Sequence, residues 1–146
     1  MTNAQSRSDA PVGVVVVTHT DYGAWLLKAA EFILGPQEHC RCVSVDMTHP
    51  VDETLVTLKA AIKDTEQGGG VLILTDMFGG TPTNLSLSLL GTGRLEVLTG
   101  VNLPMLIKIL GSRTKALETL AVEAKQAGCQ GIVVAGEVLR KKVAEG

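Results

Sequence analysis

Three absences limit what this sequence can encode. No apolar segment reaches the roughly 20 residues that a membrane-spanning helix needs, because Gly, Pro and charged residues interrupt every run. Lys and Arg residues are scattered and the formal net charge is -2, so no basic stripe indicates nucleic-acid binding. Residues 1–11 are polar and lack the apolar stretch of a secretory signal, so we expect a loose N-terminal tail on a cytoplasmic protein.

Cysteine is also scarce. The chain has three, Cys40, Cys42 and Cys129, and an odd number in a reducing compartment does not build a disulfide framework. The Cys-x-Cys spacing alone lacks the second pair that a zinc site needs. We therefore interpret these thiols as strand or core filler.

The remaining composition is that of one globular domain. The chain has 146 residues, 45% of them hydrophobic, and apolar runs alternate with helical patterns. Four strand and helix units in sequence predict a three-layer α/β/α fold with a mainly parallel, four-stranded central sheet. The expected strands are residues 12–17, 42–47, 71–76 and 95–99, and the expected helices are residues 23–34, 50–62, 84–90, 105–110 and 114–127.

A fifth apolar run, residues 131–135, follows two consecutive helices instead of one crossover. We therefore expect it to be an antiparallel strand at the edge of the sheet. The basic residues Arg140, Lys141 and Lys142 then lie in a solvated C-terminal tail, residues 137–146, and the domain itself covers residues 12–136.

Polar side chains follow the first and third strands, where open α/β sheets bind their ligands. His19 ends a run of β-branched residues that predicts a strand buried on both faces, and Asp76 ends the next such run. A carboxylate beside an imidazole can bond one ring nitrogen and leave the other as a nucleophile. We assign Asp76 that orienting role and His19 the nucleophilic one.

The turn from Gly79 to Thr83 is the second half of the predicted site. Two glycines allow a ligand to approach the backbone, and free N–H groups at a helix start favour an anion. This combination describes a phosphoryl group on a histidine, held at a helix N-terminus. A bound nucleotide is not favoured, because the Walker and dinucleotide glycine motifs are absent. His39 and His49 are interpreted as solvated loop residues.

Four ordered motifs resemble the IIA domain of the mannose family of the bacterial phosphoenolpyruvate-dependent sugar phosphotransferase system. They are Thr18-His19, the helix end at residues 29–35, the stretch 76–84 and the stretch 99–106. The resemblance covers residues 12–136. It implies a phosphotransferase in which His19 takes a phosphoryl group on Nε2 from the carrier protein HPr and passes it to a IIB component.

The same resemblance implies the surroundings of His19. Asp76 orients the ring, and the residues that hold the phosphoryl group are Thr18, Gly79, Gly80, Thr81 and Thr83. It implies no metal, no cofactor and no insertion into the membrane, although the relay can associate with membrane IIC and IID components. It further implies a homodimer in which the strand at residues 131–135 is exchanged between subunits.

Two departures from the family pattern have consequences. Thr20 stands where Gly is common after the active histidine, which predicts a stiffer loop, and the chain ends at Gly146 without a linker or IIB domain, so we expect a separate IIB protein. Two alternatives stay open. One is a regulatory module whose binding depends on phosphorylation, and the other is a flavodoxin-like fold that binds a small anion without a relay.

Overall fold

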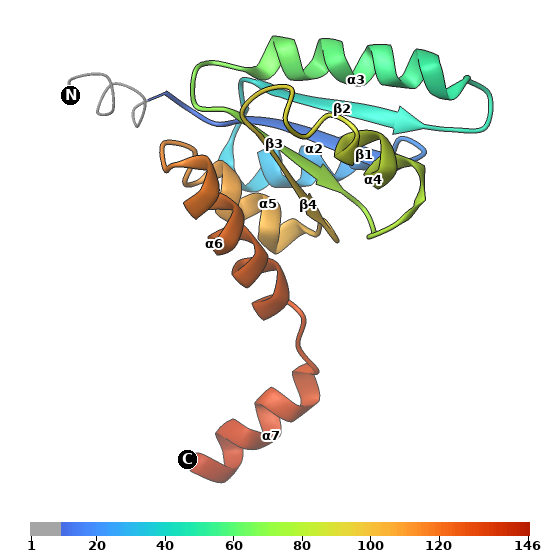
Figure 1. The fold of residues 1–146 in the computed structure, drawn as a ribbon. Coiled ribbons are helices and arrows are strands. Elements are labelled where there is room, and N and C mark those ends of the chain that lie inside the picture. The colour runs from blue at the N-terminus through green and yellow to red at the C-terminus, as the bar shows by residue number, and fades with distance from the viewer. Residues whose placement is uncertain (1–9) are drawn as a thin grey trace.

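The computed structural model describes residues 10–146, so residues 1–9 of the predicted tail lie outside the described part. Its centre is a parallel sheet with the strand order β2-β1-β3-β4 (Figure 1). The strands are β1 (Gly13–His19), β2 (Cys40–Val45), β3 (Val71–Thr75) and β4 (Leu95–Thr99). All neighbouring strands run parallel, as the alternating sequence pattern predicted.

Helices cover both faces of the sheet, which confirms the predicted three-layer fold. The face occupied by α2 (Tyr22–Leu34), α5 (Leu103–Leu110) and α6 (Leu117–Gln130) lies opposite the face occupied by α3 (Val51–Thr65) and α4 (Gly80–Leu87) (Figure 1). Within residues 10–146, no helix combines the length and the apolar character that a bilayer span requires.

The two central strands explain why the sheet forms. Val14 and Val16 of β1 pack in the cluster that includes α5 and α6, whereas Val15 and Val17 pack in the cluster that includes α3 and α4. All four side chains are fully buried, and burying a valine stabilises a fold by about 1.5–3 kcal/mol. An uninterrupted β-branched run is therefore required here, and it holds the end of β1 in a fixed position.

Several helix boundaries differ from the prediction by a few residues, and two of the differences have a clear physical reason. Helix α4 begins at Gly80, four residues before the expected start at Asn84, because the Gly-rich turn leads directly into it. Gly128 does not end α6, which continues to Gln130. A Cβ at Gly128 would lie 2.9 Å from Cε of Met105, so this glycine serves the close packing of α6 on α5 instead of a helix stop.

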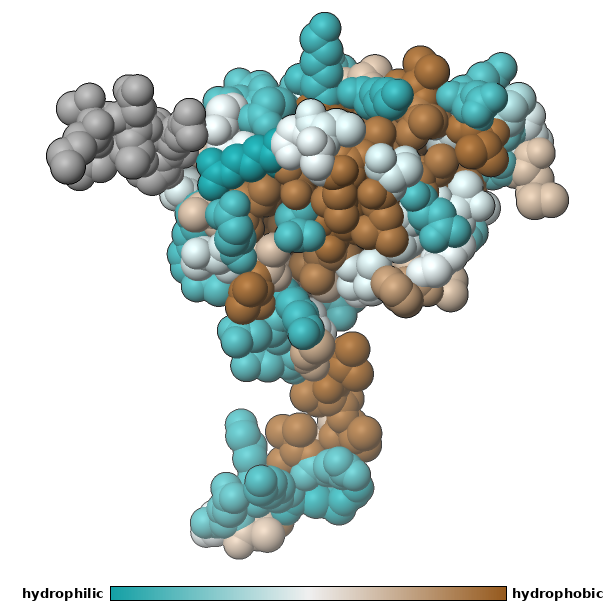
Figure 2. Space-filling model, viewed as in Figure 1, coloured by the Kyte–Doolittle hydropathy of each residue, from teal (hydrophilic) through white to brown (hydrophobic). Residues whose placement is uncertain are grey.

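The single chain does not form the predicted C-terminal edge strand. Residues 131–134 pair with no strand, and helix α7 (Ala135–Glu145) begins where the strand was expected to end. Figure 1 shows α7 extending away from the domain, and none of its residues is buried. An extended segment gains ladder hydrogen bonds only beside another strand, and the single chain offers it none. Its apolar residues form an exposed patch between the domain and α7 (Figure 2).

Candidate functional site

The structure places His19 and Asp76 together. His19 is the last residue of β1 and Asp76 follows β3, and the pairing of Val17 with Thr75 sets these neighbouring strands in a register that brings the two tips together. Nδ1 of His19 lies 2.8 Å from Oδ2 of Asp76. The backbone N–H of His19 donates to the same oxygen at 3.0 Å. One carboxylate oxygen therefore fixes both the ring and the main chain of His19.

Tyr22 is a third member of this group, and the sequence analysis missed it. Its hydroxyl donates to Oδ2 of Asp76 at 2.8 Å, from the first turn of α2. Burial, and then the hydrogen bond to Asp76, raise the pKa of Tyr22 to about 12, so it remains a donor at all physiological pH values. The only available signal was its position three residues after His19. A side chain in the first turn of the following helix can reach back to the end of the strand.

Asp76 is held as a carboxylate. Burial raises its pKa, but the hydrogen bonds from the His19 amide, the His19 ring and the Tyr22 hydroxyl outweigh burial and leave the pKa lowered. An ionised carboxylate only accepts hydrogen bonds, so Nδ1 of His19 carries the hydrogen and Nε2 carries the lone pair. The Asp76 side chain is 9% exposed and the His19 side chain is 46% exposed. The imidazole ring is thus the more exposed member of the pair.

The free edge of the His19 ring lies against the start of α4. Gly79 and Gly80 have φ angles of 88° and 82°, which residues with a side chain rarely adopt. A Cβ at Gly80 would lie 3.2 Å from both Cε1 and Nε2 of His19. Glycine therefore leaves space next to Nε2, where the unsatisfied N–H groups and the dipole of a helix start favour an anion.

The three predicted threonines do not share one position. Thr81 lines the cavity that contains His19. Thr18 is buried, and its hydroxyl donates to the Thr20 carbonyl at 2.9 Å and accepts from the Gly23 amide at 3.2 Å. Thr83 is also buried, and its hydroxyl donates to the Met77 carbonyl. Thr18 and Thr83 therefore hold the loops in place, and their hydroxyls do not fit the predicted contact with a phosphoryl group.

The loop between β4 and α5 contains Asn102, whose side chain has a structural role. Oδ1 of Asn102 accepts from the Met105 amide at 3.0 Å and caps α5, and its Nδ2 donates to the Gly128 carbonyl at 3.0 Å. Both ends of the side chain are thus engaged. The Val101 amide donates to the Thr75 carbonyl, which holds this loop to the end of β3.

Thr20 carries backbone strain. Its φ of 60° lies in the left-handed region, which costs a β-branched residue about 1–2 kcal/mol. The strain is offset by hydrogen bonds, because the Thr20 amide donates to the Val45 carbonyl at 2.8 Å and the Thr20 carbonyl accepts from Thr18. Strained non-glycine residues concentrate at functional sites. The hydrogen bond to Val45 ties the loop after His19 to the end of β2.

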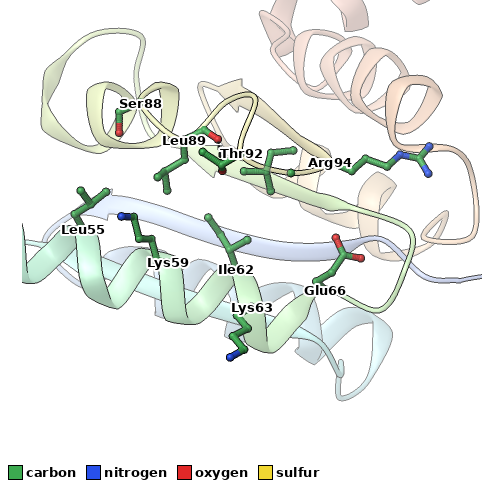
Figure 3. A pocket seen from close by; sticks show the side chains of 11 residues that line it. Leu55, Lys59, Ile62, Lys63, Glu66, Ser88, Leu89, Thr92 and Arg94 are labelled. Carbon is green, nitrogen blue, oxygen red and sulfur yellow. Dashed lines mark hydrogen bonds between the residues drawn. The ribbon is translucent and has the colours of Figure 1, made fainter.

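The cavity at these strand tips has a volume of about 560 Å³ and includes His19, Thr20 and Thr81. A larger cleft of about 770 Å³ lies elsewhere, between α3 and the connection from α4 to β4. In Figure 3, Leu55, Lys59 and Ile62 project from α3 toward Leu89. Within residues 10–146, its charged lining residues are Lys59, Lys63, Glu66 and Arg94, and none of the predicted site residues borders it.

Comparisons with known proteins agree with this geometry. Residues 13–125 match the family model EIIA-man, described as the PTS system fructose IIA component. The PTS system fructose-specific EIIA component of Bacillus subtilis is 30% identical over 132 residues, which are 89% of this chain and 90% of that protein. The mannose-specific EIIAB component of Escherichia coli is 30% identical over 83% of this chain, but the match spans only 38% of its length.

Solved structures show the same relationship. The phosphotransferase system component EIIA of Streptococcus agalactiae has a TM-score of 0.78 and 27% identity, covering 86% of this chain and 98% of that one. The mannose/sorbose specific IIA subunit from Enterococcus faecalis has a TM-score of 0.78 and 26% identity, covering 85% of this chain and 94% of that one. The chain therefore belongs to the mannose-type IIA components of the sugar phosphotransferase system, a family of phosphoryl-transfer proteins.

Proposed function

We propose that this protein is a phosphocarrier in the cytoplasm. His19 accepts a phosphoryl group on Nε2 from the phosphohistidine of HPr and passes it to a IIB component. The observation that carries this proposal is that the two nitrogens of the His19 ring have different surroundings. Nδ1 is held by Asp76, whereas Nε2 belongs to a ring that is 46% exposed and lies beside the space that Gly80 leaves at the start of α4.

The proposed step balances without a metal ion or a cofactor. The Nε2 lone pair of His19 forms the new N–P bond, the N–P bond of the donor breaks, and the donor imidazole keeps its electron pair. Because one phosphohistidine replaces another, the reaction is near thermoneutral, and the protein mainly positions the groups and shields charge. Asp76 stabilises the positive charge that develops on the ring during attack.

The direct test is incubation with phosphoenolpyruvate, enzyme I and HPr, followed by peptide mapping under conditions that preserve acid-labile phosphate. We expect phosphate on His19 and none in His19→Ala. The control His39→Ala should be labelled normally, because His39 precedes β2 at the end of the sheet where the strands begin, away from His19. Thermal unfolding of each variant controls for folding. A chain that accepts no phosphate, or phosphate on another residue, would refute the proposal.

A second arm separates the carrier from the regulatory alternative. Phosphorylated protein is mixed with IIB proteins from the same cell, and transfer is followed as loss of label from His19. Transfer supports the carrier role. Stable label together with phosphorylation-dependent binding to another protein would favour the regulatory module.

We further propose that the protein is a homodimer in which the segment 131–134 pairs with the partner's sheet. β4 is an edge strand, and Ile132, Val133 and Val134 are exposed and lie outside the helices and strands of the single chain, so both parts of such an interface are accessible. Light scattering on Val133→Asp should show a monomer. The control Val122→Asp, at a similarly exposed valine on α6, should remain dimeric. A monomeric wild-type protein would refute this assembly.

A further inference from the structure

A second carboxylate–imidazole pair lies at the same edge of the sheet as the first. Asp46 follows β2, and its Oδ1 lies 3.0 Å from Nδ1 of His49. The same oxygen accepts from the Thr48 hydroxyl at 2.6 Å and from the Thr48 amide at 2.9 Å. The His49 side chain is 62% exposed. His49 is thus a solvated loop residue, as its sequence position predicted, but its ring is also held by Asp46.

His19 and the second pair border the same cavity. His19, Thr20 and Thr81 line one part of it, and Asp46 and His49 belong to the part formed by the loop between β2 and α3. The hydrogen bond from Thr20 to Val45 joins the two loops, so their relative position is set by the backbone. His49 also borders a smaller hollow of about 300 Å³ toward Glu53 and Cys42.

The surroundings of His49 favour its charged form. The hydrogen bond to Asp46, and then the charges of Asp46 and Glu53, raise its pKa. Thr48 and His49 in turn hold the pKa of Asp46 well below its usual range. The titratable groups that border the two hollows around His49 are Asp46 on its own loop, Glu53 on α3, Cys42 on β2 and His19 on β1.

We propose that His49 is a positioning residue for phosphoryl transfer, whose imidazolium draws the anionic phosphoryl group into the cavity beside His19. This inference rests on the proposed function and assigns a residue that neither the sequence motifs nor the His19–Asp76 pair includes. A phosphoryl group carries about 1.5–2 negative charges near neutral pH, so a cation across the cavity lowers the cost of bringing it to Nε2. Asp46 acts indirectly, by holding the His49 ring and its charge in place.

The test uses full-length variants at residue 49 and a matched control. The variants are His49→Gln, which removes the charge, and His49→Lys, which keeps a charge that does not titrate near neutrality. His39→Gln makes the same substitution at the end of the sheet where the strands begin. The initial rate of His19 phosphorylation by phosphorylated HPr is measured from pH 6 to pH 9 at several donor concentrations, and thermal unfolding confirms the fold of each variant.

We expect His49→Gln to lower kcat/KM by on the order of tenfold, mainly through a higher KM, because the lost interaction steers a charged donor. His49→Lys should restore most of the rate and decline less than the wild type as the pH rises. His39→Gln should match the wild type.

Several results would overturn the inference. They are a folded His49→Gln with wild-type kinetics at every pH, a His49→Lys that is as slow as His49→Gln, or phosphate found on His49 itself. These outcomes leave the proposed function intact, because His19 would still be phosphorylated. A wild-type protein that accepts no phosphate from HPr would instead refute both.

Discussion

The contact between Gly80 and His19 allows a sharp test of where the phosphoryl group sits. Gly80→Ala places a methyl group 3.2 Å from Nε2 and Cε1 of the ring, closer than the 3.5–4.0 Å of an optimal carbon contact. Gly79→Ala is the matched control, since Gly79 has a similar positive φ but a Cβ there meets nothing within 4 Å. The two variants share backbone strain and differ in the contact with the ring.

The expected magnitudes separate the two effects. An alanine forced into these backbone regions costs about 1–3 kcal/mol, so both variants should lose stability by that amount. For a domain of this size the loss corresponds to a fall in Tm of roughly 3–10 °C. Only Gly80→Ala fills the space next to Nε2, and a displacement of about 1 Å at a reacting group can slow a reaction about 100-fold.

The assay is phosphorylation of His19 by phosphorylated HPr at a temperature where both variants are folded. We expect Gly79→Ala to retain a rate within about threefold of the wild type, and Gly80→Ala to lose at least about 30-fold, which is over 2 kcal/mol of transition-state stabilisation. Equal rates for the two variants would show that the phosphoryl group does not use this space. A greater loss in Gly79→Ala would show that backbone strain, and not the contact with the ring, controls transfer.

The remaining predictions concern the residues around the ring. Asp76→Asn should keep the fold and slow transfer, because the amide no longer enforces the Nδ1–H tautomer; an unchanged rate would remove Asp76 from the mechanism. The lowered pKa of Asp76 means that its carboxylate stabilises the fold above about pH 4 and loses this effect as the pH falls further, so urea unfolding should show the wild type losing stability relative to Asp76→Asn in acid. Tyr22→Phe should cost about 1 kcal/mol in the same unfolding measurement and slow transfer several-fold, and a full rate would limit Tyr22 to a structural role. Thr20→Gly should raise stability by about 0.5–1 kcal/mol, since relief of the left-handed strain exceeds the entropy cost of glycine; a less stable variant would show that the threonine contributes more than its backbone conformation costs.

The meeting of His19 and Asp76 could be predicted because it depends on simple rules. Two buried apolar runs in a parallel sheet end at the same edge, and polar residues at their tips then come together. Tyr22 could not be found this way, since nothing in a single sequence distinguishes a tyrosine that turns back to the strand tip from one that faces solvent. The sequence also did not indicate that the hydroxyls of Thr18 and Thr83, which were assigned to the phosphoryl group, donate to backbone carbonyls.

The C-terminal half shows a different limit. Gly128 has the composition signal of a helix stop, yet its missing side chain serves contact with Met105. The apolar residues 131–134 have the composition of a strand. A strand forms only when a neighbouring strand supplies hydrogen-bond partners, and residues 131–134 have none in the single chain. Local propensity therefore identified the four strands and the five helices α2 to α6, whereas contacts between distant segments decide where α6 ends and whether residues 131–134 form a strand.

The attachment of His19 at both its ring and its backbone amide determines how the proposed relay operates over many cycles. A ring that cannot turn offers the same nitrogen, on the same side, to whichever protein delivers the group and whichever removes it. Donor and acceptor must therefore bind to overlapping surfaces around His19 and cannot bind at the same time. Binding of the two partners then alternates through the cycle. Under such competition, very tight binding of either partner would slow phosphoryl transfer. The rate of the relay would depend on rapid dissociation of each partner and on the number of copies of this protein in the cell.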